Sequence, residues 1–260
     1  MITTEVWRAA RQQEVAEAQG DLALIGLHTI IQPLHIAGIP GYWAPLASGE
    51  PGLTLTAAAT DHITVEGVRI DGTVTLEADR TIVRFSETVT AMATSQPGSL
   101  NLLAVWDTNS EALKRYEGIS TFPYDPNWVI EAEYIASAEQ REQAFAHKDD
   151  LAGSLRYHQS PGDIRFVKDG SSYLLSPFAS NESLILVFGD TTNGKQSYGM
   201  GRMLVVTPDA RGSVTLDFNR CFLPPCAFSA HFNCPLPPPQ NRLPFEVNAG
   251  EKQVRYRFGE

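Results

Sequence analysis

The sequence predicts a mainly β protein: an N-terminal helix followed by two antiparallel units of the β-sandwich or barrel type. From residue 22 onward, short apolar or alternating runs are separated by Gly, Pro, Asp and Asn. The dipeptides Asp71-Gly72, Asp169-Gly170 and Asn193-Gly194 are typical of turns between antiparallel strands. Few helical intervals separate the runs, which argues against strand–helix–strand units.

The first segment, residues 1–20, predicts a helix over residues 3–18. Thr3 or Thr4 caps it, Glu5 lies in its first turn, and Gly20 ends it. We expect a first sandwich-like domain over residues 21–136. Its alternation is clearest at 62–76, and further strands are expected at 81–85, 100–106 and 128–135.

Residues 137–150 form the most polar interval of the chain and predict a linker or short surface helix. We place the domain boundary there. The second β domain then spans residues 151–260. Its strands are expected at 164–167, 172–175, 184–188, 202–206 and 213–218.

Composition excludes several classes of protein. Hydrophobic residues make up 43% of the 260 residues, which is enough to build a core and excludes disorder as the main state. The net charge of −10 argues against nucleic acid as a partner.

Three cysteines are too few for a disulfide scaffold and favour a reducing compartment. With neither a secretory signal nor a run of about 20 apolar residues, we expect a soluble, cytoplasmic protein without a membrane partner. Any cofactor and the oligomeric state stay unknown from the sequence.

Residues 189–195 have the glycine and lysine spacing of a phosphate-binding loop and follow an apolar run. Gln196 stands where such a loop needs a Ser or Thr, and the residues that follow predict a strand rather than a helix. A hairpin turn is therefore the better interpretation.

The segment between Cys221 and Phe245 contains seven of the 17 prolines and all three cysteines. So many prolines exclude a helix or a central strand, and we expect an ordered loop. An ordered loop rich in Pro and aromatic residues is a good place for a rigid binding surface.

Six short motifs in and around this loop resemble one known family. They are Tyr198-Gly-Met-Gly-Arg202, Leu216-Asp-Phe-Asn-Arg220, Pro224-Pro-Cys-Ala-Phe228, Cys234-Pro-Leu-Pro-Pro238, Asn241-Arg-Leu243 and Ala249-Gly-Glu-Lys252. Their order is similar to that of the bacterial family catalogued as domain of unknown function 1684, as is the stretch from Gly118 to Trp128. Residues 30–100 depart from the family, which there tends toward a forkhead-associated-like β-sandwich. The resemblance implies no established activity.

Three arginines in the matched region offer planar donors suited to carboxylate or phosphate. We expect them to line one anion-binding pocket together with two asparagines and a tyrosine. The expected ligand-binding residues are Tyr198, Arg202, Asn219, Arg220, Asn241 and Arg242. The structural alternative is that the arginines and asparagines satisfy loop carbonyls and internal acids such as Asp190, Asp217 and Glu251.

The cysteines have several interpretations. Cys226 or Cys234 is a candidate catalytic nucleophile, activated by Arg220 or Arg242 with His231 as base, and Glu251 is a candidate general acid or base. A zinc site made by Cys221, Cys226, His231 and Cys234 lacks the close ligand pairs of zinc ribbons, so we expect no metal. A Cys226–Cys234 disulfide or redox-sensing pair is disfavoured by a reducing compartment, and inert buried thiols are the remaining alternative.

The function expected from the sequence is therefore binding of a small anionic organic molecule in an Arg- and Asn-lined pocket of the C-terminal β domain. The first alternative is a hydrolase or thiol-dependent enzyme that uses Cys226, Cys234 or Glu251 in the same pocket. The second is a phosphopeptide- or partner-binding module built on the N-terminal β domain.

Overall fold

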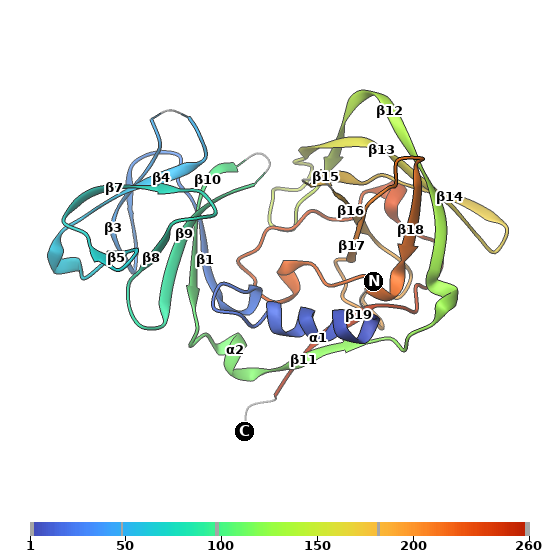
Figure 1. Cartoon of the computed structure of the whole chain (residues 1–260), viewed down its shortest axis with the longest axis horizontal. Helices are drawn as coiled ribbons and strands as arrows, with labels where there is room; N and C mark the ends of the chain where they lie inside the picture. Colours follow the sequence, from blue (N-terminus) through green and yellow to red (C-terminus); the bar gives the residue numbers. More distant parts are fainter. Residues whose placement is uncertain (1–2, 48, 97–98, 181–182, 258–260) are drawn as a thin grey trace. The chain divides into compact units, whose positions relative to one another are not determined.

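A computed structural model describes residues 3–47, 49–96, 99–180 and 183–257. The first two residues of the predicted segment 1–20 lie outside this part of the chain. Contacts divide the chain into two compact units, residues 14–115 and residues 116–260 with 1–13; we call them the 14–115 unit and the 116–260 unit. The predicted mainly β fold is confirmed: both units consist of antiparallel sheets (Figure 1), and within the described ranges none of these sheets closes into a barrel.

The 14–115 unit contains two sheets that share one core. The six-stranded sheet has the order β1 (Leu24–Thr29), β10 (Ser99–Asp107), β9 (Val89–Gln96), β8 (Ile82–Arg84), β5 (Thr64–Val65) and β6 (Val68–Arg69). The four-stranded sheet has the order β2 (Leu34–Ile36), β3 (Ile39–Pro45), β4 (Gly52–Ala57) and β7 (Gly72–Glu77). Trp43 and Leu55 of the smaller sheet and Ala91 and Leu103 of the larger are all 0% exposed in that core. Alternate residues of each strand therefore fill a sandwich interior.

The predicted hairpin at Asp71-Gly72 is wrong. Gly72 begins β7, which pairs with β4 in the other sheet rather than with β6. The tight turn of this region lies earlier, at Glu66 and Gly67, whose φ angles of 51° and 81° fit the turn that joins β5 to β6. The chain thus changes sheets where the sequence indicated a turn.

The described residues of the 116–260 unit form three sheets. The four-stranded sheet has the order β14 (Ser171–Leu175), β13 (Arg156–Lys168), β12 (Val129–Phe145) and β18 (Ser213–Asp217). The three-stranded sheet has the order β15 (Phe178–Ser180), β16 (Ser183–Phe188) and β17 (Arg202–Val206). β11 (Tyr116–Thr121) pairs with β19 (Glu251–Tyr256). Trp128, Phe166, Phe188 and Phe218 belong to the core of this unit. The hairpin at Asp169-Gly170 joins β13 to β14 as predicted, and β16 and β17 flank the predicted loop that contains Asn193-Gly194.

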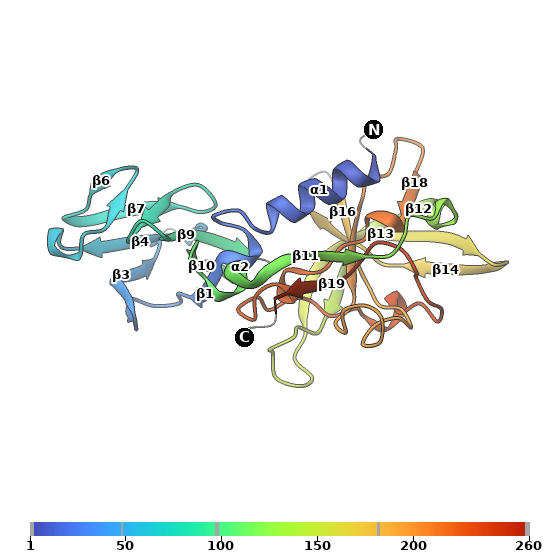
Figure 2. The ribbon, with the colours of Figure 1, turned by 90° about the horizontal axis from the view of Figure 1, so that it is seen from below.

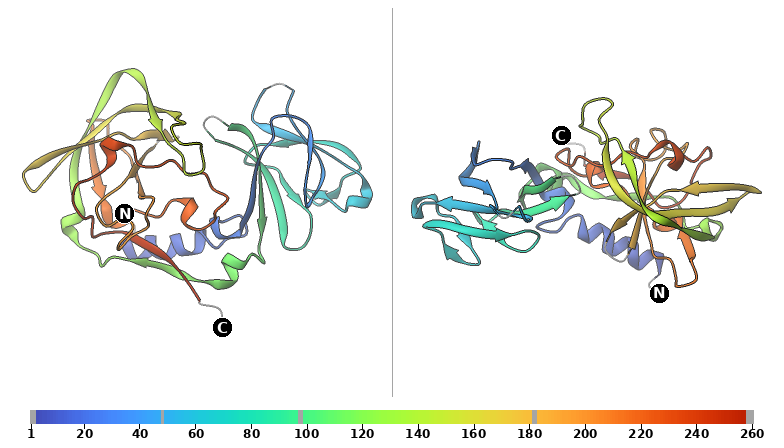
Figure 3. Two further views of the ribbon diagram at one scale, coloured as in Figure 1. Left: turned by 180° about the vertical axis from the view of Figure 1, so that it is seen from behind. Right: turned by 90° about the horizontal axis from the view of Figure 1, so that it is seen from above.

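The expected linker or short helix at residues 137–150 is wrong for residues 137–145, which form a strand. They continue β12, which runs beside β13 (Figure 3). The two strands pair out to the partners Phe145 and Arg156, after an irregularity between Ala136 and Arg141. Phe145 is 0% exposed, and Arg141 binds Asp163 on β13 at 2.6 Å. The polar composition is therefore that of a partly exposed strand. The division into domains at residues 21–136 and 151–260 stays a prediction.

The predicted N-terminal helix is α1 (Thr4–Glu14), shorter than the expected 3–18. A Cβ on Gly20 would lie 2.6 Å from the carbonyl oxygen of Glu14, so only glycine fits so close to the helix end. α1 lies beside β11 (Figure 2). Arg8 of α1 donates to the carbonyl oxygen of Phe122, just beyond β11, at 3.0 Å. The other α-helix is α2 (Glu111–Arg115). Among the described residues, no helix has the length and apolar character needed to cross a membrane.

Six short 3-10 helices complete the secondary structure of the described residues. They are η1 (Asp21–Ala23), η2 (Ala59–Asp61), η3 (Pro126–Trp128), η4 (Phe218–Arg220), η5 (Pro225–Ala227) and η6 (Pro239–Asn241). The last two lie in the Pro-rich loop, which is ordered as predicted. Backbone hydrogen bonds join this loop to other segments of the unit, among them Phe222 to Met203, Leu236 to Ala146, Leu243 to Gly189 and Cys221 to Glu251. These bonds fix the positions of the cysteines that the loop contains.

Candidate functional site: a buried cysteine pair

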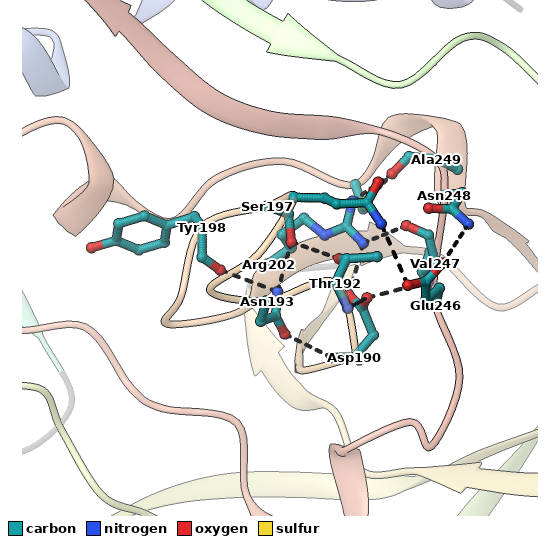
Figure 4. A network of polar contacts seen from close by, with 12 residues as sticks. Asp190, Thr192, Asn193, Ser197, Tyr198, Arg202, Glu246, Val247, Asn248 and Ala249 are labelled. Carbon is teal, nitrogen blue, oxygen red and sulfur yellow. Dashed lines mark hydrogen bonds and ion pairs between the residues drawn. The ribbon is translucent and has the colours of Figure 1, made fainter.

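Arg202, one of the three arginines expected to bind an anion, lies in the interior of the 116–260 unit. Its side chain and that of Asp190 are both 0% exposed and form an ion pair of 2.8 Å (Figure 4). The same guanidinium group donates to the carbonyl oxygens of Val247, Ala249 and Glu251. Arg202 therefore anchors the segment before β19 to β17, and this corrects its prediction as a ligand-binding residue.

The Asp190 carboxylate organises the loop between β16 and β17. It accepts the backbone N–H of Thr192 at 2.8 Å and that of Val247 at 3.2 Å. The Thr192 hydroxyl lies 2.7 Å from that of Ser197, and the Asn193 side chain donates to Ser197 at 2.9 Å (Figure 4). The loop with the spacing of a phosphate-binding loop is thus closed by its own side chains, as expected for a hairpin connection.

The side chains of Asn219 and Asn241 form hydrogen bonds with the backbone. Asn219 donates to the carbonyl oxygen of Asp125 at 3.0 Å and accepts the N–H of the same residue at 3.0 Å. Asn241 does the same with Ser176, at 2.9 and 2.8 Å, and also donates to the carbonyl oxygen of Val187. Both are 0% exposed. The structure therefore uses these amides to join loops to strands, as in the structural alternative.

Arg220 and Arg242, the other two arginines expected to bind an anion, do not share the buried position of Arg202. Arg220 forms an ion pair of 3.2 Å with Asp217, and its side chain is 29% exposed. It lines a hollow of about 350 Å³ together with Glu5, whose negative charge opposes binding of an anion. Arg242 is exposed on the segment that runs beside Gly189. Because Arg202 is fully buried, the expected pocket lined by all three arginines is not formed.

Glu251, the candidate acid or base, is 1% exposed. Its carboxylate accepts the backbone N–H of Leu223 at 2.8 Å and lies 3.8 Å from Nε of Arg11 on α1. A carboxylate with these internal partners is placed to hold the start of the Pro-rich loop against α1. It has little access to a substrate.

The cysteines separate into one isolated residue and one pair, and all three are thiols. Cys221 is 0% exposed, and its sulfur donates to the carbonyl oxygen of Ala249 at 3.4 Å. Burial raises the pKa of its thiol to about 11. His231 is exposed. The four ligands of the zinc alternative are thus not gathered, and the described residues hold no group of three or more His, Cys, Asp or Glu suited to a metal ion.

Cys226 and Cys234 lie next to each other. The backbone N–H of Cys226, in η5, donates to the sulfur of Cys234 at 3.3 Å. The Tyr198 hydroxyl lies 2.9 Å from the carbonyl oxygen of Cys226 and 3.6 Å from its sulfur. Cys226 and Cys234 are each 7% exposed. Three of the predicted site residues, from motifs far apart in the sequence, are thus brought together at one place.

The surroundings of Cys226 favour its thiolate. The hydrogen bond from the Cys234 thiol is the largest cause that lowers the pKa of Cys226 to about 7, against the opposing effect of burial. The Tyr198 hydroxyl and the charge of Lys148 contribute in the same direction. The expected activators Arg220 and Arg242 are not among these causes. In turn, burial and then the hydrogen bond with Cys226 raise the pKa of Tyr198.

Lys148 is a site residue that the sequence interpretation missed, because it falls within the expected linker. Its backbone N–H donates to the carbonyl oxygen of Cys234 at 3.1 Å. Its ammonium group binds the carbonyl oxygens of Ala230 and Phe232 and the carboxylate of Asp149. The ammonium group of Lys148 lies near the cysteine pair because residues 146–148 pair with residues 234–236. No local sequence pattern predicts this pairing.

The fold and site define a mainly β protein whose Pro-rich C-terminal loop holds a buried cysteine pair. A family model described as "Protein of unknown function (DUF1684)" matches residues 114–252, just over half of the chain. The chain belongs to this family, which confirms the resemblance of its C-terminal motifs.

One similar solved structure is the solution NMR structure of an uncharacterized protein from gene locus rrnAC0354 of Haloarcula marismortui. The two chains are 33% identical, over 52% of this chain and 76% of that one, with a TM-score of 0.43. No curated protein matches the chain.

Proposed function

We propose that this protein is a thiol-dependent redox protein in which Cys226 is the attacking thiolate and Cys234 its partner thiol. The observation that supports the proposal most is the contact of 3.3 Å between the Cys226 amide and the Cys234 sulfur, beside the Tyr198 hydroxyl. A reactive cysteine needs a stabilised thiolate and some access to solvent. Cys226 has a pKa of about 7 and retains 7% exposure, whereas Cys221 has neither property.

The reaction class we propose is oxidation of the pair by a hydroperoxide. The Cys226 thiolate attacks one peroxide oxygen, the O–O bond breaks, and the alkoxide takes a proton and leaves as an alcohol, so that Cys226 becomes a sulfenic acid. The Cys234 sulfur then attacks the Cys226 sulfur. The S–O bond breaks, a disulfide forms, and hydroxide leaves with the Cys234 proton as water. Two electrons pass from the thiols to the peroxide, and an external dithiol restores the reduced pair.

Peptide mapping by mass spectrometry after treatment with hydrogen peroxide tests this proposal. We expect loss of two hydrogen atoms and a linkage between the peptides of Cys226 and Cys234. Cys234→Ser should instead accumulate sulfenic acid at Cys226, and Cys221→Ser should behave like the wild type. Oxidation at Cys221 as readily as at Cys226, or no disulfide in the folded protein, would contradict the proposal.

The other expected functions have less support from the geometry. Binding of a small anion by Arg220 or Arg242 stays a prediction. At the hollow beside Arg220, the negative charges of Asp217 and Glu5 oppose it. The phosphopeptide- or partner-binding alternative concerns the 14–115 unit and stays a prediction as well. Neither alternative accounts for the lowered pKa of Cys226.

A further inference from the structure

The 14–115 unit contains a pocket of about 410 Å³ beside its edge strand β1. Its walls come from β1 and β10, from the turn between β2 and β3 with the start of β3, and from the turn between β8 and β9 with the start of β9. Residues of both sheets of the unit thus line the pocket. This volume is at the lower end of the range of about 300–1,000 Å³ for small-molecule sites.

The lining of the pocket is apolar and uncharged apart from one histidine. The apolar walls are formed by Ile25, Ile39, Pro40, Phe85, Val89 and Val105. The polar side chains are His28 and Ser86, and the Ser86 hydroxyl oxygen already accepts the N–H groups of Thr88 and Val89. The lining contains neither Lys nor Arg. Such walls oppose a phosphate or carboxylate and favour a neutral, mostly apolar molecule.

The backbone of β1 is shaped around this pocket. Its pairing with β10 shifts between Leu24 and Gly26, so that Ile25 occupies a bulge and is 40% exposed although it is apolar. Bulges re-aim side chains and are frequent beside binding sites. A Cβ on Gly26 would lie 2.7 Å from Nε2 of His28, so the glycine makes room for the imidazole ring at the pocket wall.

We infer that this pocket binds a small, uncharged, mostly apolar organic molecule. Ile25 on the bulge, Phe85 and Ile39 contribute to its apolar walls. The site is independent of the cysteine pair, which belongs to the other unit.

Fluorescence titration of the full-length protein with the neutral probe N-phenyl-1-naphthylamine tests this inference. We expect saturable binding of one probe per chain. Ile25→Glu, which places a charge in the apolar wall, should weaken binding roughly tenfold. Ile82→Glu is a matched control, because Ile82 is also 40% exposed in the same unit but does not line the pocket.

The inference is overturned if the probe does not saturate, or if the two variants weaken binding equally, since the probe would then lie on general apolar surface. Unfolding of each variant is measured in parallel. If Ile25→Glu does not fold, Ala37→Glu replaces it, because Ala37 lines the pocket on an exposed turn. Unchanged binding by a folded Ala37→Glu protein would then overturn the inference.

Discussion

The Tyr198 hydroxyl lies 2.9 Å from the carbonyl oxygen of Cys226 and 3.6 Å from its sulfur, so one side chain contacts both the backbone and the thiol of the proposed nucleophile. Tyr198 lies in the loop between β16 and β17, whereas Cys226 lies in the Pro-rich loop. The contact therefore couples the reactivity of the thiol to the fold of a second loop.

Tyr198→Phe should reduce the reactivity of Cys226 at neutral pH. The change removes a donor that stabilises the thiolate, so the pKa of Cys226 should rise. A rise of about one unit would slow alkylation by iodoacetamide at pH 7 roughly fivefold, because a smaller fraction is ionised. Alkylation rates measured by mass spectrometry check this. Tyr157→Phe is the control, since Tyr157 is 57% exposed, and an equal effect there would contradict the role of Tyr198.

Replacing Arg202 should destabilise the protein strongly. Arg202→Met leaves the fully buried Asp190 carboxylate without its ion-pair partner, and such a change costs about 3–5 kcal/mol. The free energy of unfolding in urea measures the effect. Arg165→Met is the control: its pair with Glu133 is about half exposed and should contribute only about 0–1 kcal/mol. Equal losses in both variants would show that Arg202 is not an internal anchor.

Acid should weaken the fold through the buried imidazole of His158. Burial is the largest cause that lowers its pKa to about 4, and the positive charges of His147 and Arg156 act in the same direction. The unfolded state therefore binds the proton more readily. The resulting stability is complete above about pH 6.5 and is lost as the pH falls toward 4, by about 1–2 kcal/mol at pH 5.

Urea unfolding at pH 7 and pH 5 measures this loss. His158 packs against the rings of Phe145 and Phe178, so His158→Phe suits its apolar surroundings and should remove this part of the pH dependence. His147 remains in the variant and provides the background titration. The same pH dependence in wild type and variant would contradict the assignment to His158.

The fold class was predictable from the alternation of short apolar runs, but the pairing of the strands was not. Asp71-Gly72 has the composition of a hairpin turn, yet the chain changes sheets there, because the core of the sandwich needs β7 beside β4. The polar stretch over 137–145 resembles a linker, because a strand that leaves alternate residues in solvent has a similar composition. Both errors concern tertiary pairing, which local patterns do not contain.

The candidate site was predictable only in part. The motifs that contain Tyr198, Cys226 and Cys234 are visible in the sequence, and the structure brings these residues together. The partners that decide a residue's role are not visible. The sequence suggests that Arg202 binds a ligand. In the structure, Asp190 and three carbonyl oxygens accept its hydrogen bonds. Lys148 has no local signal because it reaches the cysteine pair through pairing between segments more than eighty residues apart.

The pH profile of Cys226 alkylation in the wild-type protein tests the central claim most directly. Site-resolved mass spectrometry with iodoacetamide follows Cys226, with Cys221 as an internal reference in the same chain. A stabilised thiolate predicts half-maximal reactivity of Cys226 near pH 7, and Cys221 should stay unreactive until well above it. A Cys226 profile that matches an ordinary thiol, with an inflection near pH 8.5, would contradict the proposed redox centre.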